Sequence, residues 1–402
     1  MQRNSTSQIS KQELRSRALE FGFSDLAFVD IEPLLEAEER FIDWRAKGYA
    51  GTMSYLLRTN PINARPENLL AGAKTLLVFT ANYFSECPPR PGADYGRVAS
   101  YAVGKDYHKV LKKKIKEFIA ANEDLQSIFA NSRFFTDAVP LLEKAFAEKA
   151  GLGFQGKNTL LISKQSGSFS FIAEIISDLE FHDDLNSEFL DTDIEIETQS
   201  KSLGCAECTR CIDVCPTNAL DDIYSIDSRK CISYWTIEKR GEIPQALHEG
   251  IGEWLFGCDL CQEVCPYNRK GSSSLAREAK PPFPEFQPES GASHWLYLPM
   301  LLAMHENTFM DYYEEAFQQD ASLLRFARKQ LVKFELETKV LEKSSDEYLQ
   351  SFNEFLDKIF FFKFGETALS RSKRAGLIRN ASIVARNSAA SKSLELVDLI
   401  NS

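Results

Sequence analysis

The sequence lacks any hydrophobic run of membrane-spanning length, since no stretch approaches the roughly 18 apolar residues that a transmembrane helix needs. Its first nine residues also lack the apolar core of a secretory signal peptide. We therefore expect no membrane association. We expect a monomer in the cytoplasm, where reducing conditions keep thiols free.

Positive charge is scarce as well. Lys and Arg number 47 against 58 Asp and Glu, which gives a net charge of −11. A protein that coats nucleic acid would be basic, so any nucleic-acid contact must be a local patch. Residues 165–200 contain ten acidic residues and no basic one, and we interpret the part at 183–198 as an exposed, solvated loop. One segment near the C-terminus has the opposite sign and contains Arg371, Lys373, Arg374, Arg379 and Arg386.

Cysteine, by contrast, is present in a strict pattern. Residues 205–216 read C-x2-C-x2-C-x3-C-P, and residues 258–266 repeat the shorter form C-x2-C-x3-C-P, with Cys231 between the two runs. This is the bacterial ferredoxin pattern, which indicates two 4Fe-4S clusters, and the fourth Cys of such a run binds the other cluster. The predicted ligands of the first cluster are Cys205, Cys208, Cys211 and Cys265. Those of the second are Cys215, Cys231, Cys258 and Cys261. The ninth thiol, Cys87, has no partner in the pattern.

Structural zinc or disulfides are the alternatives to iron–sulfur clusters. A zinc site would use only four of these eight thiols. Neither zinc nor disulfides explain why both runs end in C-x3-C-P. We therefore favour two clusters.

Hydrophobic periodicity and turn residues predict a chain of three parts. Helices are expected at 11–21, 107–122 and 140–150, and strands at 23–31, 75–83, 133–138 and 168–176. Their alternation predicts an α/β domain, 1–200. A ferredoxin-like domain follows at 201–275. The remainder, 276–402, begins with a Pro-rich linker and then has a helical pattern without strand alternation.

Several phrases together resemble the epoxyqueuosine reductase family. The resemblance covers residues 10–275 and returns at 365–387. The phrases are Gly-Lys-Asp-Tyr-His (104–108), Thr-Asp-Ala-Val-Pro-Leu-Leu-Glu (136–143), Ala-Gly-Leu-Gly-Phe-Gln-Gly-Lys-Asn (150–158), Cys-Ile-Ser-Tyr-Trp-Thr-Ile-Glu (231–238), Phe-Gly-Cys-Asp-Leu-Cys-Gln-Glu-Val-Cys-Pro (256–266) and Arg-Ala-Gly-Leu-Ile-Arg-Asn (374–380).

This resemblance implies a cobalamin-dependent oxidoreductase of tRNA processing. Such an enzyme performs the last step of queuosine biosynthesis, reducing the epoxide of epoxyqueuosine at the wobble base of a tRNA to the alkene of queuosine. The implied fold is an α/β cobalamin-binding domain, a ferredoxin-like domain with two 4Fe-4S clusters and a C-terminal α-helical (HEAT-like) domain. Base-off cobalamin and an external electron donor are also implied.

Asp137 is the predicted catalytic residue. Its neighbours in sequence are apolar, and a carboxyl group in an apolar pocket keeps its proton near neutral pH. Losing the epoxide oxygen as water requires a proton donor. The alternative interpretation is a cap for the helix after Pro140, but the resemblance places the family's general acid at Asp137.

The resemblance also supplies contact residues. Predicted cobalamin contacts are Asp137, Asn158, Ser233, Cys258 and Asp259. Predicted tRNA contacts are Lys239, Arg240, Arg374 and Arg379; seen alone, the basic segment could equally be a solvated helix face. His108 is not expected to bind cobalt, because the family holds cobalt without a protein histidine. Glu143 is expected to anchor its helix or orient a neighbour.

Two other functions fit part of the pattern. A reductive dehalogenase-like corrinoid protein also couples two clusters to cobalamin, but it usually carries an export signal and lacks the phrase at 374–380. An electron-transfer module would need neither Asp137 nor the basic segment.

Overall fold

The computed structural model describes residues 7–58, 60–137, 141–163, 165–183, 204–268 and 282–401. The chain forms two compact units, each assembled from three separated segments. The first unit contains Met1–Glu86, Tyr107–Arg229 and Asp259–Pro284, and the second contains the remainder. These units are interleaved along the chain, unlike the three consecutive domains expected from sequence, and that division stays a prediction.

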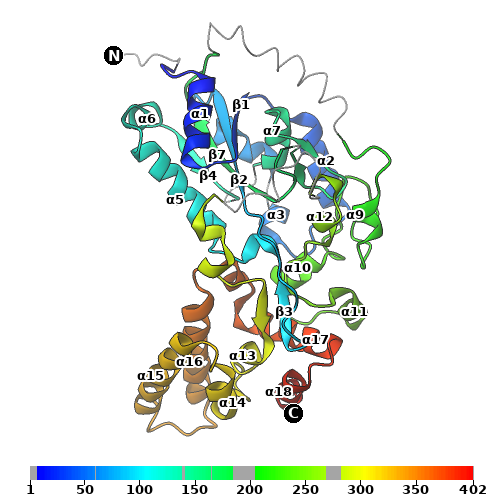
Figure 1. Cartoon of the computed structure of the whole chain (residues 1–402), viewed down its shortest axis with the longest axis vertical. Coiled ribbons are helices and arrows are strands. Elements are labelled where there is room, and N and C mark those ends of the chain that lie inside the picture. The colour runs from blue at the N-terminus through cyan, green and yellow to red at the C-terminus, as the bar shows by residue number, and fades with distance from the viewer. Residues whose placement is uncertain are drawn as a thin grey trace. The chain divides into compact units, whose positions relative to one another are not determined.

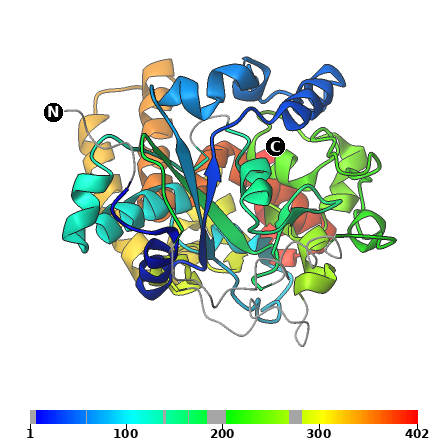
Figure 2. The ribbon, with the colours of Figure 1, turned by 90° about the horizontal axis from the view of Figure 1, so that it is seen from above.

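A four-stranded antiparallel sheet organises the first unit, with strand order β1-β2-β7-β4. Its strands are β1 (Asp25–Asp30), β2 (Thr75–Asn82), β7 (Ser170–Ser177) and β4 (Arg133–Phe135). Figure 2 shows the blue strands β1 and β2 and the green strand β7 side by side. Every residue of β2 is buried, so both faces of the sheet are covered. All four predicted strands are present.

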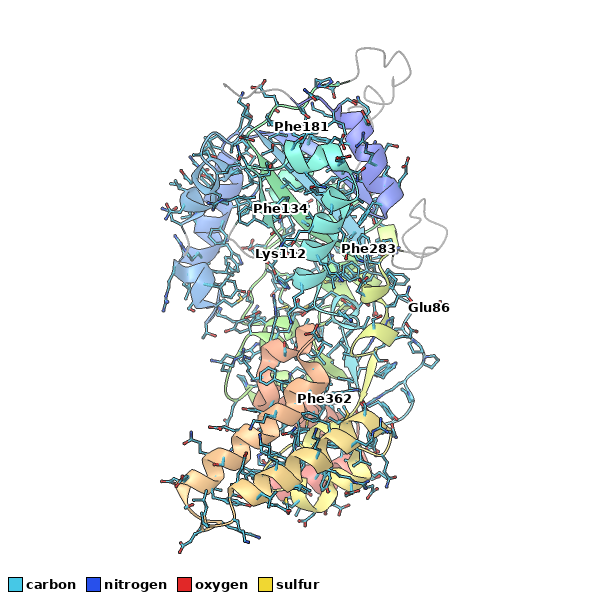
Figure 3. The ribbon with its side chains drawn as sticks, turned by 90° about the vertical axis from the view of Figure 1, so that its left-hand side faces the viewer. Glu86, Lys112, Phe134, Phe181, Phe283 and Phe362 are labelled. Atoms are coloured by element: carbon cyan, nitrogen blue, oxygen red, sulfur yellow. The ribbon has the colours of Figure 1, made fainter. Side chains whose placement is uncertain are left out.

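Helices border this sheet (Figure 1). The longer helices of the first unit are α1 (Lys11–Phe21), α2 (Leu35–Ala46), α5 (Tyr107–Ala120) and α7 (Glu143–Lys149). Shorter ones are α3 (Ser54–Arg58), α4 (Pro66–Leu69), α6 (Glu123–Ile128), α9 (Arg210–Asp213) and α12 (Leu260–Glu263). The small hairpin β5–β6 pairs Phe154–Gln155 with Leu161–Ile162. Figure 3 labels Phe134 of β4 and Lys112 of the neighbouring α5.

Local signals explain why α1 has the bounds that the sequence predicts. The Ser10 side chain accepts a hydrogen bond from the Glu13 backbone N–H, which caps the first turn. Gly22 ends the helix at φ 119, a left-handed conformation that glycine adopts without strain.

The second unit combines a three-stranded sheet with helices. Its strand order is β8-β3-β9 (Trp254–Phe256, Tyr95–Val98 and Trp295–Tyr297). The principal helices are α10 (Ile232–Ile237), α11 (His248–Ile251), α13 (Leu298–Leu302), α14 (Phe309–Ala316), α15 (Ala321–Glu337), α16 (Asp346–Phe364), α17 (Lys373–Asn387) and α18 (Ser391–Asn401). The helical C-terminal region is therefore confirmed, although β9 is a strand that the sequence pattern did not predict.

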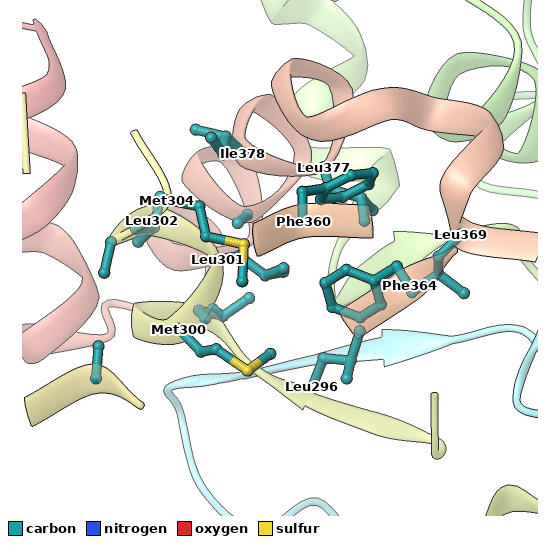
Figure 4. Close-up of a cluster of buried hydrophobic side chains, with 14 of the residues drawn as sticks. Leu296, Met300, Leu301, Leu302, Met304, Phe360, Phe364, Leu369, Leu377 and Ile378 are labelled. Atoms are coloured by element: carbon teal, nitrogen blue, oxygen red, sulfur yellow. The ribbon is translucent and has the colours of Figure 1, made fainter. Parts of the chain in front are cut away.

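One hydrophobic core holds the second unit together. Figure 4 shows part of it. Leu301 of α13 and Met304, which follows that helix, pack with Phe360 and Phe364 of α16. Leu377 of α17 closes the same cluster. This packing fixes α17, which carries Arg374 and Arg379, two of the four predicted tRNA contacts. Among the described helices, none has the length and apolar character to cross a membrane.

Candidate functional site

Asp137 lies two residues beyond the end of β4, in the first unit. Its backbone has φ 48, in the left-handed region that non-glycine residues seldom adopt. Such conformations persist where surrounding contacts hold them, and they gather at functional sites. The side chain is 54% exposed, so the carboxyl group is open to an incoming molecule.

Two side chains from the start of α5 hold the Asp137 carboxyl group. The Tyr107 hydroxyl donates to its Oδ2 across 2.7 Å, and His108 Nε2 lies 3.2 Å from the same oxygen. The Tyr107 ring is itself fixed, because it stacks on Phe171 of β7 with centroids 4.4 Å apart. This arrangement orients the carboxyl group before any substrate binds.

The helix-cap interpretation of Asp137 is wrong. Helix α7 begins at Glu143 rather than at Pro140, and its capping residue is Leu142, without a side-chain hydrogen bond. The contact runs the other way, since the Asp137 backbone N–H donates to Glu143 Oε1 across 2.7 Å. Glu143 therefore orients its neighbour Asp137, which is one of the two roles expected for it; the other was to anchor its own helix. The polar partners of Asp137 also replace the apolar pocket that its sequence neighbours suggested.

Two further carboxyl groups interact with Asp137, and both have a raised pKa. Burial, followed by repulsion from Asp137, raises the pKa of Glu143 to about 8. Glu174 of β7 is completely buried, and burial raises its pKa well above the usual range, with Glu143 and Asp137 adding to the shift. Carboxyl groups with such pKa values keep their protons at neutral pH.

A cavity of about 620 Å³ opens in front of Asp137 and Glu143. Its far wall is α2, which contributes the aromatic rings of Phe41 and Trp44 and the guanidinium of Arg40. The Trp44 indole N–H donates to the carbonyl oxygen of Ile226, tying α2 to the segment at 222–226 that also lines the cavity. Aromatic and cationic walls around a carboxyl group suit a planar, polar ligand.

Electrostatic interactions connect the four cysteines predicted for the first cluster. Cys205, Cys208 and Cys211 come from one loop and α9, and Cys265 follows α12. The pKa of the Cys211 thiol is raised to about 11, first by burial and then by the neighbouring Cys205 and Cys208 thiolates, with Cys265 contributing less. The same two thiolates raise the pKa of Cys265, after burial. These interactions agree with the crossed assignment, but in the part of the chain that the structure describes no three His, Cys, Asp or Glu side chains are arranged to hold one metal ion, so the first ligand set stays a prediction.

Lys157 holds the loop of this first cluster. Its ammonium group donates to the carbonyl oxygens of Ala206 and Cys208, at 2.7 and 3.1 Å, and its backbone N–H lies 3.3 Å from Cys205 Sγ. Backbone N–H groups directed at cluster sulfurs tune the reduction potential of such a centre. Lys157 is buried, so its charge is used entirely within the fold.

The second predicted cluster is divided between the two units. Cys215 and Cys261 belong to the first unit, and Cys231 and Cys258 to the second. The Ala219 N–H lies 3.3 Å from Cys215 Sγ. Within the described residues, no three His, Cys, Asp or Glu side chains are arranged to hold one metal ion. This second ligand set stays a prediction.

The predicted cobalamin contacts are divided in the same way. Asn158 and Asp259 are buried in the first unit, where Asn158 Nδ2 lies 3.4 Å from the Cys261 carbonyl oxygen and Asp259 accepts from Gln262. Ser233 and Cys258 belong to the second unit. These four contacts therefore stay predictions too.

The predicted tRNA contacts come together in the second unit. Arg240 donates to the carbonyl oxygens of Arg371 and Ser372, so the segment at 239–240 lies against the start of α17. Arg379 binds the same segment through the carbonyl oxygens of Lys239 and Gly241. Residues about 130 positions apart thus form one basic surface.

Two of the four predicted tRNA contacts have extensive internal partners. Arg379 makes five hydrogen bonds within the unit, and burial lowers its pKa to about 10. Arg374 binds Asp357, Asn353 and the carbonyl oxygen of Met304. Both arginines therefore stabilise the fold, and their contact with tRNA stays a prediction.

Comparisons with known proteins decide the family. A family model described as "4Fe-4S double cluster binding domain" matches residues 204–268, which contain all eight patterned cysteines. A second, described as "Epoxyqueuosine reductase QueG, DUF1730", matches residues 64–138 and so reaches Asp137. Epoxyqueuosine reductase of Escherichia coli strain K12 is 35% identical over 286 residues, which are 69% of this chain and 70% of that protein. The chain belongs to the epoxyqueuosine reductase family. The enzyme of Cyclobacterium marinum is 38% identical over 66% of this chain and 81% of its own length.

The fold agrees with this membership. A crystal structure of epoxyqueuosine reductase with an epoxyqueuosine-modified tRNA-Tyr stem loop superposes with a TM-score of 0.68. The superposition covers 96% of this chain and 83% of the other, at 24% sequence identity. At this identity the likeness concerns the fold alone.

Sequence reasoning missed three features of this reductase site. Glu174 looks like one polar residue within a buried strand, and nothing in the pattern links it to Asp137. Nothing in the sequence pattern links the Lys157 ammonium group to the loop of Cys205 and Cys208, because this contact depends on tertiary structure. The Tyr107–Asp137 bond joins residues 30 positions apart, although the phrase at 104–108 did mark the right segment.

Proposed function

We propose that this member of the family reduces epoxyqueuosine to queuosine at the wobble position of a tRNA, using two electrons from an external donor. The observation that carries the proposal is the oriented carboxyl group of Asp137, held by Tyr107 and His108 at the edge of the 620 Å³ cavity. An epoxide oxygen leaves as water only after protonation, and Asp137 is placed to protonate it.

The residues around Asp137 would divide the chemistry between them. Tyr107 and His108 orient the carboxyl group, and the Glu143 bond to the Asp137 backbone fixes the loop. Phe41 and Trp44 would pack against the cyclopentane ring or base of the bound nucleotide, excluding water from the epoxide. A nucleotide splayed out of its stack could enter such a cavity, since single-stranded loops present their bases in this way.

The polar residues predicted to contact cobalamin suit such a cofactor. His108 Nε2 is engaged by Asp137 rather than directed elsewhere, which agrees with base-off cobalamin that has no protein nitrogen on cobalt. Asp137, Asn158, Ser233, Cys258 and Asp259 would hold the cofactor. When bound, cobalamin would supply a strongly reducing cobalt centre, and the two 4Fe-4S clusters would pass electrons toward it one at a time.

One assay tests the proposal directly. Protein reconstituted anaerobically with iron, sulfide and cobalamin is incubated with a reductant and tRNA carrying epoxyqueuosine, and the nucleosides are read by mass spectrometry. We expect queuosine to replace epoxyqueuosine. Unchanged epoxyqueuosine with fully loaded protein would overturn the proposal and return the chain to a corrinoid dehalogenase or an electron carrier, which family membership now disfavours.

We further propose that tRNA phosphates contact the basic surface around the start of α17. Lys373 and Arg240 are exposed there and Lys239 is partly exposed, while the exposed Arg386 extends the surface to the last turn of α17. Phosphate contacts need positive charge with little demand on geometry, so exposed cations suit them better than the internally bonded Arg374 and Arg379.

Reversing two exposed charges on this surface should weaken tRNA binding. We expect Lys373→Glu with Arg386→Glu to lower affinity and to flatten the slope of log K against log salt by roughly one to two, because fewer counterions are released. Affinity is measured at several salt concentrations. Lys329→Glu with Lys343→Glu, which changes two exposed lysines at and beyond α15, is the matched control. Equal slopes for both double variants would remove the proposed surface.

A further inference from the structure

The proposed reaction consumes more protons than Asp137 can hold. Opening an epoxide to an alkene breaks two C–O bonds, and two electrons with two protons convert the released oxygen to water. One carboxyl group supplies one proton per turnover. A second proton donor is therefore required close to Asp137.

Glu174 is a buried carboxyl group without a partner. It lies on β7 opposite Val78 of β2 and Phe135 of β4, and its exposed fraction is zero. Among the described residues neither of its carboxyl oxygens has a hydrogen-bond partner. A charged carboxylate in this position would lose its hydration without compensation, so the neutral, protonated form is favoured.

The side chain of Glu174 points to the face of the sheet that α7 covers. Residues opposite one another in an antiparallel pair share a face, and both Val78 and Phe135 belong to or pack against the apolar cluster that contains Leu141 and Phe146. Glu143 begins the helix that covers this face, and it interacts electrostatically with Glu174. Glu174 therefore lies directly behind the Asp137 site.

Glu143 connects this buried group to Asp137. Its Oε1 accepts the Asp137 backbone N–H, and the Glu143 and Asp137 side chains line the same cavity, where a water molecule could bridge two carboxyl groups. The titratable groups that act on this region are Asp137, His108 and Tyr107 on one side and Lys144 on α7. The Asp137 backbone N–H, Lys144 and a protonated His108 favour ionisation of Glu143, but burial and the Asp137 carboxylate outweigh them and keep its pKa raised.

We propose that Glu143 and Glu174 form a proton store that recharges Asp137 within one turnover. Asp137 gives its proton to the epoxide oxygen as the first C–O bond breaks, and Glu143 then reprotonates Asp137 for the second cleavage. Glu174 then passes its proton to the ionised Glu143, and solvent afterwards returns the two protons that the turnover consumed. The two electrons come from the external donor. This inference rests on the proposed function, because the proton count is that of epoxide reduction.

Infrared spectroscopy tests the proton store without any turnover. The full chain is titrated from pH 5 to pH 9, and the C=O band of protonated carboxylic acid is followed. We expect a band that persists at pH 7 and is lost in part in Glu174→Gln and in part in Glu143→Gln. Glu148→Gln, on the exposed side of α7, should leave it unchanged. A spectrum at pH 7 with no protonated carboxyl band assigned to Glu174 would overturn the inference.

The pH profile of turnover is the second readout. Wild-type turnover should fall on the alkaline side near pH 8, where Glu143 loses its proton. We expect Glu143→Gln to be roughly tenfold slower at pH 7 and to lack this alkaline limb, with partial rescue by a small weak acid in the buffer. A wild-type rate and profile in both Gln variants would refute the store. Absence of queuosine with wild-type protein would instead refute the proposed function and leave the infrared result standing.

The stability of the variants should separate a proton-holding role from a packing role. A raised carboxyl pKa stabilises the fold below the unfolded-state value, and this contribution is lost as the pH rises through the folded-state value. Wild-type protein should therefore lose stability toward pH 9, and Glu174→Gln should lose less. An identical pH dependence of the melting temperature in wild type and Glu174→Gln would show that Glu174 is not protonated at neutral pH.

Discussion

Replacing Cys265 with serine should empty the first 4Fe-4S cluster, although Cys265 belongs to the downstream cysteine run. Iron content should fall from about eight to about four per chain, because a 4Fe-4S cluster needs all four thiolates for stable assembly. Cys265 interacts electrostatically with Cys205, Cys208 and Cys211, three residues of the upstream run. The loss should therefore resemble that of Cys208→Ser in iron content and in the EPR spectrum of the reduced protein.

Cys87→Ser is the control for this experiment, because Cys87 stands outside both runs and lies in a Pro-rich segment. It should keep about eight irons and full activity. Turnover in Cys265→Ser should fall to background, because electrons no longer have a complete path. A Cys265→Ser protein that loses the same cluster as Cys231→Ser would contradict the crossed assignment.

Local sequence signals predicted the elements of the first unit well. The Ser10 cap and Gly22 fix both ends of α1, and the β-branched and apolar run at 75–83 produces the fully buried β2. The ferredoxin pattern was equally decisive, since its spacing is dictated by cluster geometry. These features depend on neighbours within a few residues.

Features that depend on distant partners could not be predicted. Helix α7 starts at Glu143 rather than at the predicted Pro140, and Glu143 binds the backbone N–H of Asp137, six residues before it. The strand β9 forms because Tyr95 and Arg97 of β3 offer edge positions to Tyr297 and Trp295. Nothing within residues 295–297 distinguishes this strand from the helices that follow.

Charge alone was also a poor guide to individual arginines. The basic segment at 371–386 is real, yet Arg374 and Arg379 donate into carbonyl and side-chain oxygens of their own unit. A guanidinium has five donors, so it serves as readily to tie loops as to bind phosphates. The solvent exposure of each guanidinium group decides whether it ties loops together or can bind phosphates, and this exposure cannot be read from the sequence.

The conservative change Asp137→Asn should abolish most of the turnover while leaving the protein folded and loaded. An amide has nearly the shape of the carboxyl group and keeps contact with Tyr107 and His108, but it has no acidic proton to give. A general acid contributes a factor on the order of 10² to 10⁴, so we expect a loss of at least about 10² in single-turnover rate.

The matched control is Asp43→Asn, because Asp43 lines the same cavity from α2 and would change the charge there equally. If charge in the cavity were the cause, both variants would lose activity. If the lost proton donor is the cause, only Asp137→Asn will lose activity. Its iron content, cobalamin spectrum and tRNA affinity will match those of the wild type. A near-normal rate in Asp137→Asn would leave Tyr107 and Glu143 as the remaining proton donors at this site, since both reach Asp137 directly.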